Sequence, residues 1–185
     1  MAFPFSRYFG AQSILVEDVR SKLWTENVNE SSFAGESAAY QVAVLEQYKI
    51  YVEMADRISA RRALANAFFL SLNTATLTAG AALWRSSVLN TWMLVLPLGL
   101  LLTQTAAWFW LVRSYRQLNT AKYIVIGMLE EKLPASPYWR AEWKALGEGK
   151  DKARYWPLTH LEQWLPVTLA VLYVFGFVIA VVTSR

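Results

Sequence analysis

Three stretches of this chain are too apolar and too long to belong to a soluble domain of its size. They run from Ala63 to Leu83, from Val88 to Val112 and from Leu165 to Thr183, and none contains Asp, Glu, Lys, Arg or His. Each is close to the roughly 20 residues that a helix needs to cross about 30 Å of hydrocarbon. The sequence therefore predicts an all-α integral membrane protein with three transmembrane helices.

Composition excludes several function classes. The 185 residues leave too little chain outside three spans for a large catalytic domain. The net charge of +4 does not require nucleic acid as a partner, because cations beside membrane spans are expected anyway. The chain has no Cys and one His, which excludes thiolate and multi-histidine metal sites within one chain. We expect no nucleic-acid binding, no metal and no cofactor.

Cations lie unevenly around the spans. Several precede the first span and follow the second, whereas only Arg85 lies between the first two spans and only Arg185 follows the third. The positive-inside rule then places the N-terminus and the 113–160 segment in the cytoplasm, and the C-terminus outside. The expected parts are an N-terminal cytoplasmic amphipathic segment (1–36), a cytoplasmic juxtamembrane helix (37–62), three transmembrane helices (63–84, 88–112, 161–183) and a cytoplasmic segment of short helices (113–160).

A heptad-spaced stripe leads into the first span. From Ser37 to Phe69 the chain has no Gly or Pro, and from Val44 its stripe residues recur by four and three. This spacing predicts one long helix, partly cytoplasmic and partly in the membrane. The stripe packs either within one subunit or between identical subunits, and both interpretations stay open. The candidate oligomer contacts are Val44, Tyr48, Tyr51, Asp56, Arg57, Ile58, Arg61 and Arg62, with ion pairs between subunits expected for Asp56, Arg57 and Arg61.

The first span carries more polar side chains than a lipid-facing helix can use. Asn66, Asn73 and Gly80 recur every seven residues and share one helix face, and a set of hydroxyl groups forms an adjacent face. In lipid such groups need partners from other helices or from water. Two interpretations stay open, close helix–helix packing and the lining of a wet pore. Gln104 is a lone polar residue in the second span, and an interhelical hydrogen bond is its simpler interpretation. The candidate pore or interhelical face therefore comprises Asn66, Ser71, Asn73, Thr74, Thr78, Gly80 and Gln104.

The third span and the cytoplasmic segment carry no recognisable catalytic group. The third span has no strongly polar side chain beyond Thr168 and Tyr173, so we expect it to face lipid. An ionisable group deep in a membrane span is usually functional, and none of the three spans contains one. The acidic side chains of the cytoplasmic segment, Glu130 among them, are interpreted as a solvated face. We therefore expect the protein not to be an enzyme.

Two local patterns predict helix starts. Ser136-Pro137 suits an N-cap followed by proline at the first helical position. Thr159 and Glu162 fit a capping box at the start of the third span, so Glu162 is interpreted as a structural cap rather than a catalytic carboxylate.

Three tryptophans of the cytoplasmic segment are candidates for contacts outside the chain. Tryptophan is favoured both as an interface anchor and at the membrane–water boundary. These residues therefore contact either a cytoplasmic protein partner or the membrane surface, and they are Trp139, Trp143 and Trp156.

Two blocks of the sequence resemble a known group of proteins. The first comprises residues 46–49 (EQYK), 51–62 (YVEMADRISARR), 66–70 (NAFFL) and 72–74 (LNT). It resembles bacterial small membrane proteins of the RipA type, described as octameric, and the wider SLATT group of two-span effector domains from bacterial conflict systems. The second comprises residues 142–150 (EWKALGEGK), 155–159 (YWPLT) and 161–166 (LEQWLP), and it resembles the RipA-type C-terminal region.

The resemblance implies a homo-oligomer, an octamer by analogy, in the bacterial inner membrane. The SLATT group implies a pore-forming or membrane-perturbing effector released by a sensing partner. This chain departs from that group in having a third span and no fused sensor domain, and neither group supplies a catalytic motif. We expect a homo-oligomeric ring whose partners are copies of itself and membrane lipids, with channel-like activity. The alternative is a non-conducting scaffold or regulator that recruits a cytoplasmic protein partner.

Overall fold

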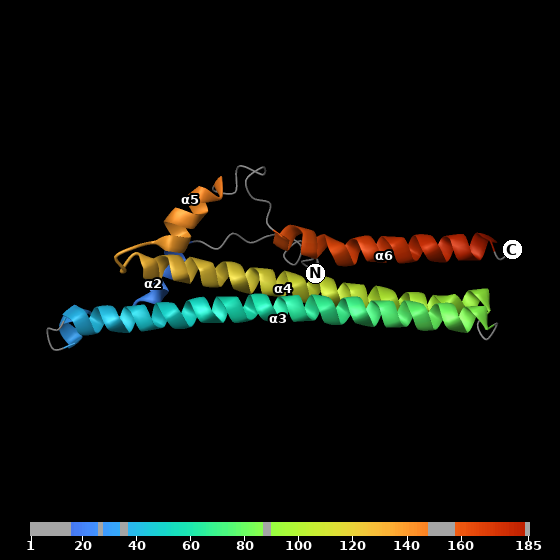
Figure 1. The fold of residues 1–185 in the computed structure, drawn as a ribbon, viewed down its shortest axis with the longest axis horizontal. Coiled ribbons are helices and arrows are strands. Elements are labelled where there is room, and N and C mark those ends of the chain that lie inside the picture. The colour runs from blue at the N-terminus through green and yellow to red at the C-terminus, as the bar shows by residue number, and fades with distance from the viewer. Residues whose placement is uncertain (1–15, 26–27, 34–36, 87–89, 148–157, 184–185) are drawn as a thin grey trace, which may run out of the picture. The chain divides into compact units, whose positions relative to one another are not determined.

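The computed structural model describes residues 16–25, 28–33, 37–86, 90–147 and 158–183, and within these ranges the chain forms helices and no strand (Figure 1). Three helices are long and apolar enough to cross a membrane, which confirms the expected all-α membrane fold. The elements are α2 (Val16–Leu23), the short 3-10 helix η1 (Glu30–Phe33), α3 (Ser37–Arg85), the 3-10 helix η2 (Thr91–Leu94), α4 (Val95–Glu130), the π-helical turn η3 (Pro137–Glu142), α5 (Trp143–Ala145) and α6 (Leu158–Thr183).

The two longest helices pass through the boundaries expected between membrane and cytoplasmic segments. α3 has 49 residues and joins the expected segments 37–62 and 63–84 into one helix. α4 has 36 residues, starts at Val95 rather than near residue 88, and continues past residue 112 to Glu130. Neither contains a proline beyond its first turn, and each tolerates its interior glycines, which are Gly80 in α3 and Gly99 and Gly127 in α4. Pro97 lies in the first turn of α4, where its missing amide hydrogen has no intrahelical acceptor.

The described chain divides into two compact units, each with its own core. Unit 1 comprises residues 1–54 and 120–148, and unit 2 comprises residues 55–119 and 149–185. α3 and α4 each contribute residues to both units.

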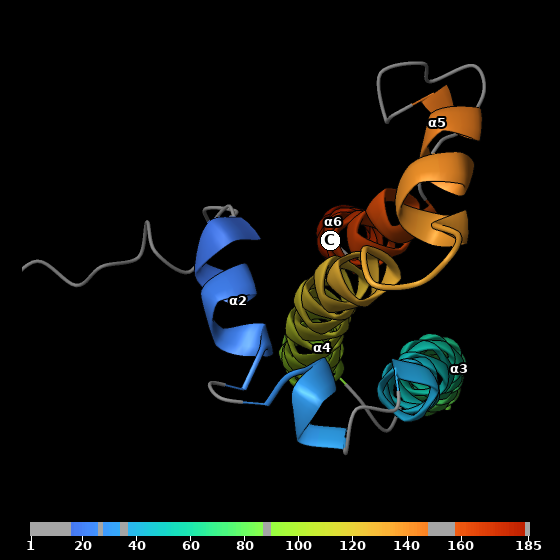
Figure 2. The ribbon, with the colours of Figure 1, turned by 90° about the vertical axis from the view of Figure 1, so that its left-hand side faces the viewer.

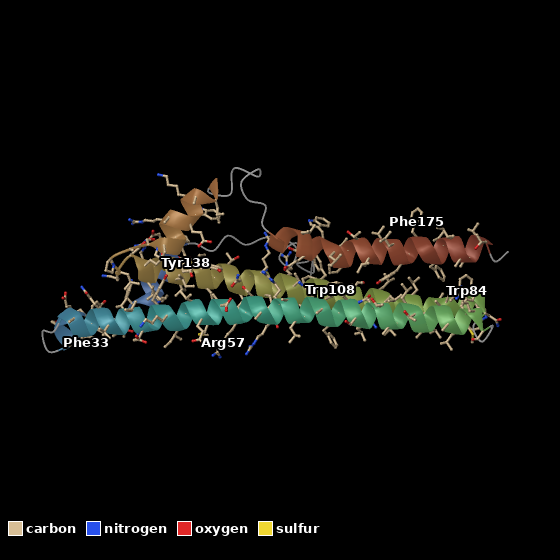
Figure 3. The ribbon with its side chains drawn as sticks, viewed as in Figure 1. Phe33, Arg57, Trp84, Trp108, Tyr138 and Phe175 are labelled. Atoms are coloured by element: carbon tan, nitrogen blue, oxygen red, sulfur yellow. The ribbon has the colours of Figure 1, made fainter. Side chains whose placement is uncertain are left out.

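Unit 2 contains most of the apolar helical surface. Its parts of α3 and α4 run antiparallel and bury Leu101, Trp108 and Val112 of α4 between them. The first turns of α6 are held by two polar contacts, with Arg62 Nε 3.0 Å from Glu162 Oε2 and Arg116 Nη1 donating to Gln163 Oε1 at 2.9 Å. Beyond these turns α6 exposes large apolar side chains such as Phe175, which points away from α4 in Figure 3.

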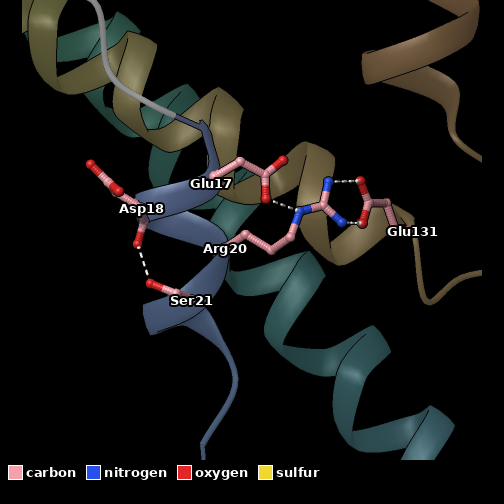
Figure 4. Close-up of polar contacts among 5 residues, drawn as sticks. All are labelled: Glu17, Asp18, Arg20, Ser21 and Glu131. Carbon is pink, nitrogen blue, oxygen red and sulfur yellow. Dashed lines mark hydrogen bonds and ion pairs between the residues drawn. The ribbon is translucent and has the colours of Figure 1, made fainter.

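Unit 1 packs α2 and the segment around α5 against the C-terminal part of α4, on opposite sides of it (Figure 2). Its core contains Val44 of α3 with Ile126 and Leu129 of α4. α2 is attached through the Arg20 guanidinium, whose two terminal nitrogens donate to both Glu131 carboxylate oxygens at 2.7 and 2.8 Å (Figure 4). Within the expected N-terminal amphipathic segment (1–36), α2 is helical and none of the residues of Val16–Leu23 is buried, while residues 1–15 lie outside the described residues.

Candidate functional site

The candidate polar face of α3 consists of two surfaces with different surroundings. The first is directed at α4 of the same chain. Trp108 of α4, which is fully buried, donates from Nε1 to Asn66 Oδ1 at 2.8 Å and stacks on the Phe69 ring with centroids 6.0 Å apart. Gln104 of α4 donates from Nε2 to Thr76 Oγ1 at 3.0 Å. These are hydrogen bonds between helices, formed within one subunit.

Asn73 and Gly80 belong to the same inward surface. The Asn73 side chain is 1% exposed, and its Nδ2 donates to the Phe69 carbonyl at 2.8 Å. Gly80 lies against Pro97 of α4, so that a Cβ atom at position 80 would lie 3.2 Å from the proline Cβ. The heptad-spaced Asn66, Asn73 and Gly80 therefore lie on the surface of α3 that is directed at its own α4, which favours helix packing over pore lining for these three residues.

The second surface of α3 is exposed and consists of small and hydroxyl-bearing side chains. Thr74 Oγ1 donates to the Leu70 carbonyl and Thr78 Oγ1 to the Thr74 carbonyl, each at 2.8 Å. These hydroxyls are thus satisfied by their own helix. Small residues extend the surface along α3 with three- and four-residue spacing, so that its exposed members are Ala60, Ala63, Ala67, Ser71, Thr74, Thr78 and Ala81. We call this set the small-residue face.

The candidate oligomer contacts are mostly engaged within the chain. Val44 and Ile58 are 4% and 8% exposed. Tyr48 donates its hydroxyl to Glu130 at 3.2 Å, and Lys122 Nζ lies 4.8 Å from the centre of the Tyr51 ring. Arg62 forms the ion pair with Glu162 described above. The stripe therefore packs inside one subunit along much of its length, while the exposed candidates are Asp56, Arg57 and Arg61.

The capping box expected at Thr159 and Glu162 is not the geometry observed. α6 begins at Leu158, so Thr159 lies inside the first turn rather than at the cap position. The Glu162 carboxylate is directed at Arg62, where opposite charges at 3.0 Å attract more strongly than a carboxylate and an amide at the helix start. Glu162 therefore ties α6 to α3.

The tryptophan candidates are partly exposed. Trp139 and Trp143 are 40% and 49% exposed, and Trp156 lies outside the described residues. One side of the Trp139 ring lies on Gly127 of α4, where a Cβ atom would come within 2.6 Å of the ring. Only a glycine at position 127 leaves room for this ring.

Glu130, at the end of α4, was wrongly assigned to a solvated face. Its side chain is 1% exposed, and it accepts four hydrogen bonds. Tyr48 Oη and the Tyr138 backbone N–H donate to Oε1 at 3.2 and 3.1 Å. Ser136 Oγ and the Trp139 backbone N–H donate to Oε2 at 2.6 and 3.0 Å. Glu130 thereby joins α3, α4 and the start of η3.

This arrangement corrects the cap predicted at Ser136. The first amide hydrogens of a helical segment need an acceptor, and serine is a common one. Here the Ser136 side chain makes no capping hydrogen bond, and Glu130 accepts the amide hydrogens of Tyr138 and Trp139 instead. A sequence signal was available: a carboxylate at the last turn of one helix, six residues before the Ser-Pro start of the next.

The surroundings of Glu130 shift the acidity of Tyr48, which lies before the apolar stretch of α3. Burial, then the neighbouring Glu130 charge and the hydrogen bond to it, raise the pKa of Tyr48 to about 12. Each of these disfavours the phenolate. Across the described ranges, no group of three His, Cys, Asp or Glu side chains is placed to hold a metal ion.

One comparison with known proteins gives a match. A model of the octameric membrane protein family (8xMP) matches residues 45–182, a range that contains α4, most of α3 and nearly all of α6. No curated protein and no solved structure matches the chain.

Proposed function

This chain belongs to the octameric membrane protein family, and we propose that it forms a channel-like homo-oligomer in the bacterial inner membrane. The family description supports self-association, and the three apolar helices support membrane residence. Pore formation is the finer proposal. It rests on the small-residue face of α3 and on the resemblance to SLATT effector domains.

The small-residue face is the observation that carries the proposal. Helices in lipid gain little from apolar contact alone, so they associate where small side chains allow close approach. The exposed residues Ser71, Thr74 and Thr78 lie on this face, within the segment expected to span the membrane. By contrast, α6 exposes large apolar side chains suited to lipid, including Leu161, Val171 and Phe175. We therefore assign α3 to the inside of the assembly and α6 to its outside.

Hydroxyl groups suit a surface that is wet at some positions and packed at others. Because Thr74 and Thr78 donate to their own backbone, their oxygens can still accept hydrogen bonds from water. A ring of identical α3 helices would repeat these oxygens around its axis. Outside the span, exposed Asp56, Arg57 and Arg61 supply charges for ion pairs between neighbouring subunits.

The orientation and the lack of catalysis belong to the same proposal. The lysine and arginine bias supports a cytoplasmic N-terminus and an external C-terminus. A path for ions needs no nucleophile, and the proposed function is not that of an enzyme.

The test is ion efflux from sealed liposomes that contain the purified protein, beside protein-free liposomes. We expect efflux from the wild-type protein and about tenfold less from Thr74→Val/Thr78→Val, in which shape is kept and the accepting oxygens are lost. Thr103→Val is the matched control, because Thr103 is also exposed and also donates to its own helix, at the Gly99 carbonyl, but lies on α4. Two results would reject a pore lined by these hydroxyls. One is that Thr103→Val lowers efflux as much as Thr74→Val/Thr78→Val does. The other is that wild-type liposomes show no efflux under any voltage or salt gradient applied.

A second candidate function is a scaffold that recruits a cytoplasmic protein. The supporting observation is that Glu130 fixes the backbone at Tyr138 and Trp139, close to the exposed Trp143. Exposed aromatic side chains on a fixed backbone are favourable anchors for a partner. Capture of a specific protein by the wild type but not by Trp143→Ala would support the scaffold.

A further inference from the structure

Large apolar side chains are exposed on the part of α3 that precedes its charge-free stretch. Within residues 38–62 they are Val42, Leu45, Ile50 and Met54, each between 37% and 57% exposed. The charge-free stretch begins at Ala63. At about 1.5 Å per residue, Met54 lies about 14 Å and Val42 about 32 Å before it along the helix. Lipid hydrocarbon therefore does not cover these side chains, and an exposed apolar surface outside the membrane indicates a protein contact.

These residues form two separate flanks of the helix. With 3.6 residues per turn, each residue turns the helix by about 100°. Val42 and Leu45 then share one mean direction, and Ile50 and Met54 share another, about 130° away. We call the first pair flank A and the second pair flank B. Val52, which is partly exposed, follows Leu45 by seven residues and extends flank A.

The rest of the helix surface shows how the flanks are placed. The side of α3 opposite to the middle of the two flanks packs on α4 of the same subunit, where Val44 is buried and Tyr48 donates to Glu130. The exposed side chains of Glu46 and Glu53 lie between the flanks, on the side away from α4. Seen along its axis, α3 thus has its own α4 behind it, an apolar flank on either side and carboxylates in front.

Two different flanks indicate a head-to-tail contact between copies of the chain. In a two-fold dimer one patch meets the same patch of the partner, whereas in a closed ring each subunit uses two different patches. From one member of a ring of eight, the two neighbours lie in directions about 135° apart. This angle is close to the separation of flanks A and B, and the number eight comes independently from the family description.

Charges further along α3 match the same two flanks. Asp56 follows Val52 by four residues and lies on the side of flank A. Arg61 follows Met54 by seven residues and lies on the side of flank B. Both side chains are exposed. Where flank A of one subunit meets flank B of the next, an acid is therefore brought near a base, and such complementarity selects the partner and fixes its register.

We propose that neighbouring subunits contact each other through α3 outside the membrane, with flank A of each subunit against flank B of the next. The proposal deepens the homo-oligomer proposed above and rests on its self-association, but not on ion conduction. A second copy of the chain is the partner because it presents the complementary flank at the same height above the membrane. The contact directs Glu46 and Glu53 towards the axis of the ring and leaves α4 on its outer side.

The experiment is disulfide cross-linking of the full-length protein in membranes, which is direct because the chain contains no cysteine. Val52→Cys/Met54→Cys places one thiol on each flank. The two positions are two residues apart on opposite sides of the helix, so their thiols do not bond within one chain. We expect mild oxidation to produce a ladder of covalent oligomers that extends beyond the dimer, because each subunit is linked to both neighbours.

The single variants are the matched controls. Val52→Cys and Met54→Cys each carry a thiol on one flank only, so each should give about tenfold less cross-linked product, because a disulfide needs Cα atoms within about 7 Å. Neither can give a species larger than a dimer. Leu45→Cys/Ile50→Cys replaces the double variant if that protein does not assemble. Native mass spectrometry in mild detergent gives the subunit number of every variant before oxidation.

Three results would overturn the proposal. Dimers from a single variant as abundant as the products of the double variant would show that the same residue meets its own copy. No cross-link in either double variant, although native mass spectrometry shows the oligomer, would place the subunit contact elsewhere and leave the homo-oligomer standing. A cross-link to a different protein would show that this protein covers the flanks. A monomeric wild type would reject the homo-oligomer itself, and this proposal with it.

Discussion

Glu130→Gln is the sharpest single test of the unit 1 structure. The substitution keeps the shape of the side chain but replaces one accepting oxygen by an amide that only donates. If the amide takes the Oε2 position, it can still bond to the Ser136 hydroxyl, which is able to accept. It cannot bond to the Trp139 N–H, which is a donor. With the amide at Oε1, the orphaned donor is the Tyr138 N–H.

The expected magnitude follows from that single lost acceptor. A buried donor left without an acceptor costs about 1–3 kcal/mol, and about 1.4 kcal/mol corresponds to a tenfold change in an opening equilibrium. We therefore expect the amide hydrogens of Tyr138 and Trp139 to exchange about 10- to 100-fold faster with solvent deuterium in Glu130→Gln. Glu130→Ala removes every acceptor and should release the segment from Pro137 to Glu142 entirely.

The adjacent carboxylate supplies the control. Glu131 is partly exposed and bonds to Arg20 of α2, without any hydrogen bond to η3. Glu131→Gln should leave exchange at Tyr138 and Trp139 at the wild-type rate and cost about 0–1 kcal/mol, as exposed ion pairs do. Hydrogen–deuterium exchange with mass spectrometry on peptides covering residues 134–143 measures both variants. Unchanged exchange in Glu130→Gln would refute the role assigned to its carboxylate.

Other substitutions test the remaining contacts. Gly127→Ala should destabilise the protein by about 1–3 kcal/mol, because its methyl group would meet the Trp139 ring, whereas Gly99→Ala should be neutral or stabilising; thermal unfolding in detergent compares the two, and equal midpoints would contradict the contact. Trp108→Phe should cost about 1–3 kcal/mol, because Asn66 loses its partner from α4, and an unchanged unfolding midpoint would argue against that bond. Burial and Glu130 raise the pKa of Tyr48 to about 12 in the folded protein, so its contribution to stability is full below the unfolded value of 10.0 and is lost as pH rises towards 12; the ultraviolet titration of Tyr48→Phe should therefore show less late-ionising tyrosine absorbance than that of the wild type, by the amount of one tyrosine.

Sequence reasoning succeeded where composition and periodicity act over many residues. Long apolar stretches without charges predict transmembrane helices, because a helix in lipid satisfies its backbone hydrogen bonds within its own segment. The absence of Gly and Pro between Ser37 and Phe69 predicted a continuous helix there, and α3 covers this range. The second span was predicted to end at residue 112 because charge returns at Arg113, and α4 continues past this membrane boundary to Glu130, because a change of environment does not end a helix.

The candidate site was harder to predict because periodicity gives a face but not its neighbour. Heptad spacing placed Asn66 and Asn73 on one helix face. Whether that face packs on α4 or lines a pore depends on the positions of Trp108 and Gln104 in the folded chain, which residue spacing does not give. Glu130 was missed for a related reason. A carboxylate among lysines and arginines is solvated in most settings, and its burial depends on a turn at residues 134–137 that folds back over it.

The hydrogen bonds of the polar side chains in unit 2 also constrain how the protein is made. Thr74, Thr78, Thr103 and Thr168 each donate within their own helix, so a single helix carries them into lipid already satisfied. Gln104 has no such local acceptor and bonds instead to Thr76 of α3. Gln104→Leu should therefore ease insertion of α4 alone and leave insertion of α3 and α4 together unchanged, which a glycosylation-reporter assay can measure. During biogenesis, then, we expect α3 and α4 to leave the translocon as a preformed pair.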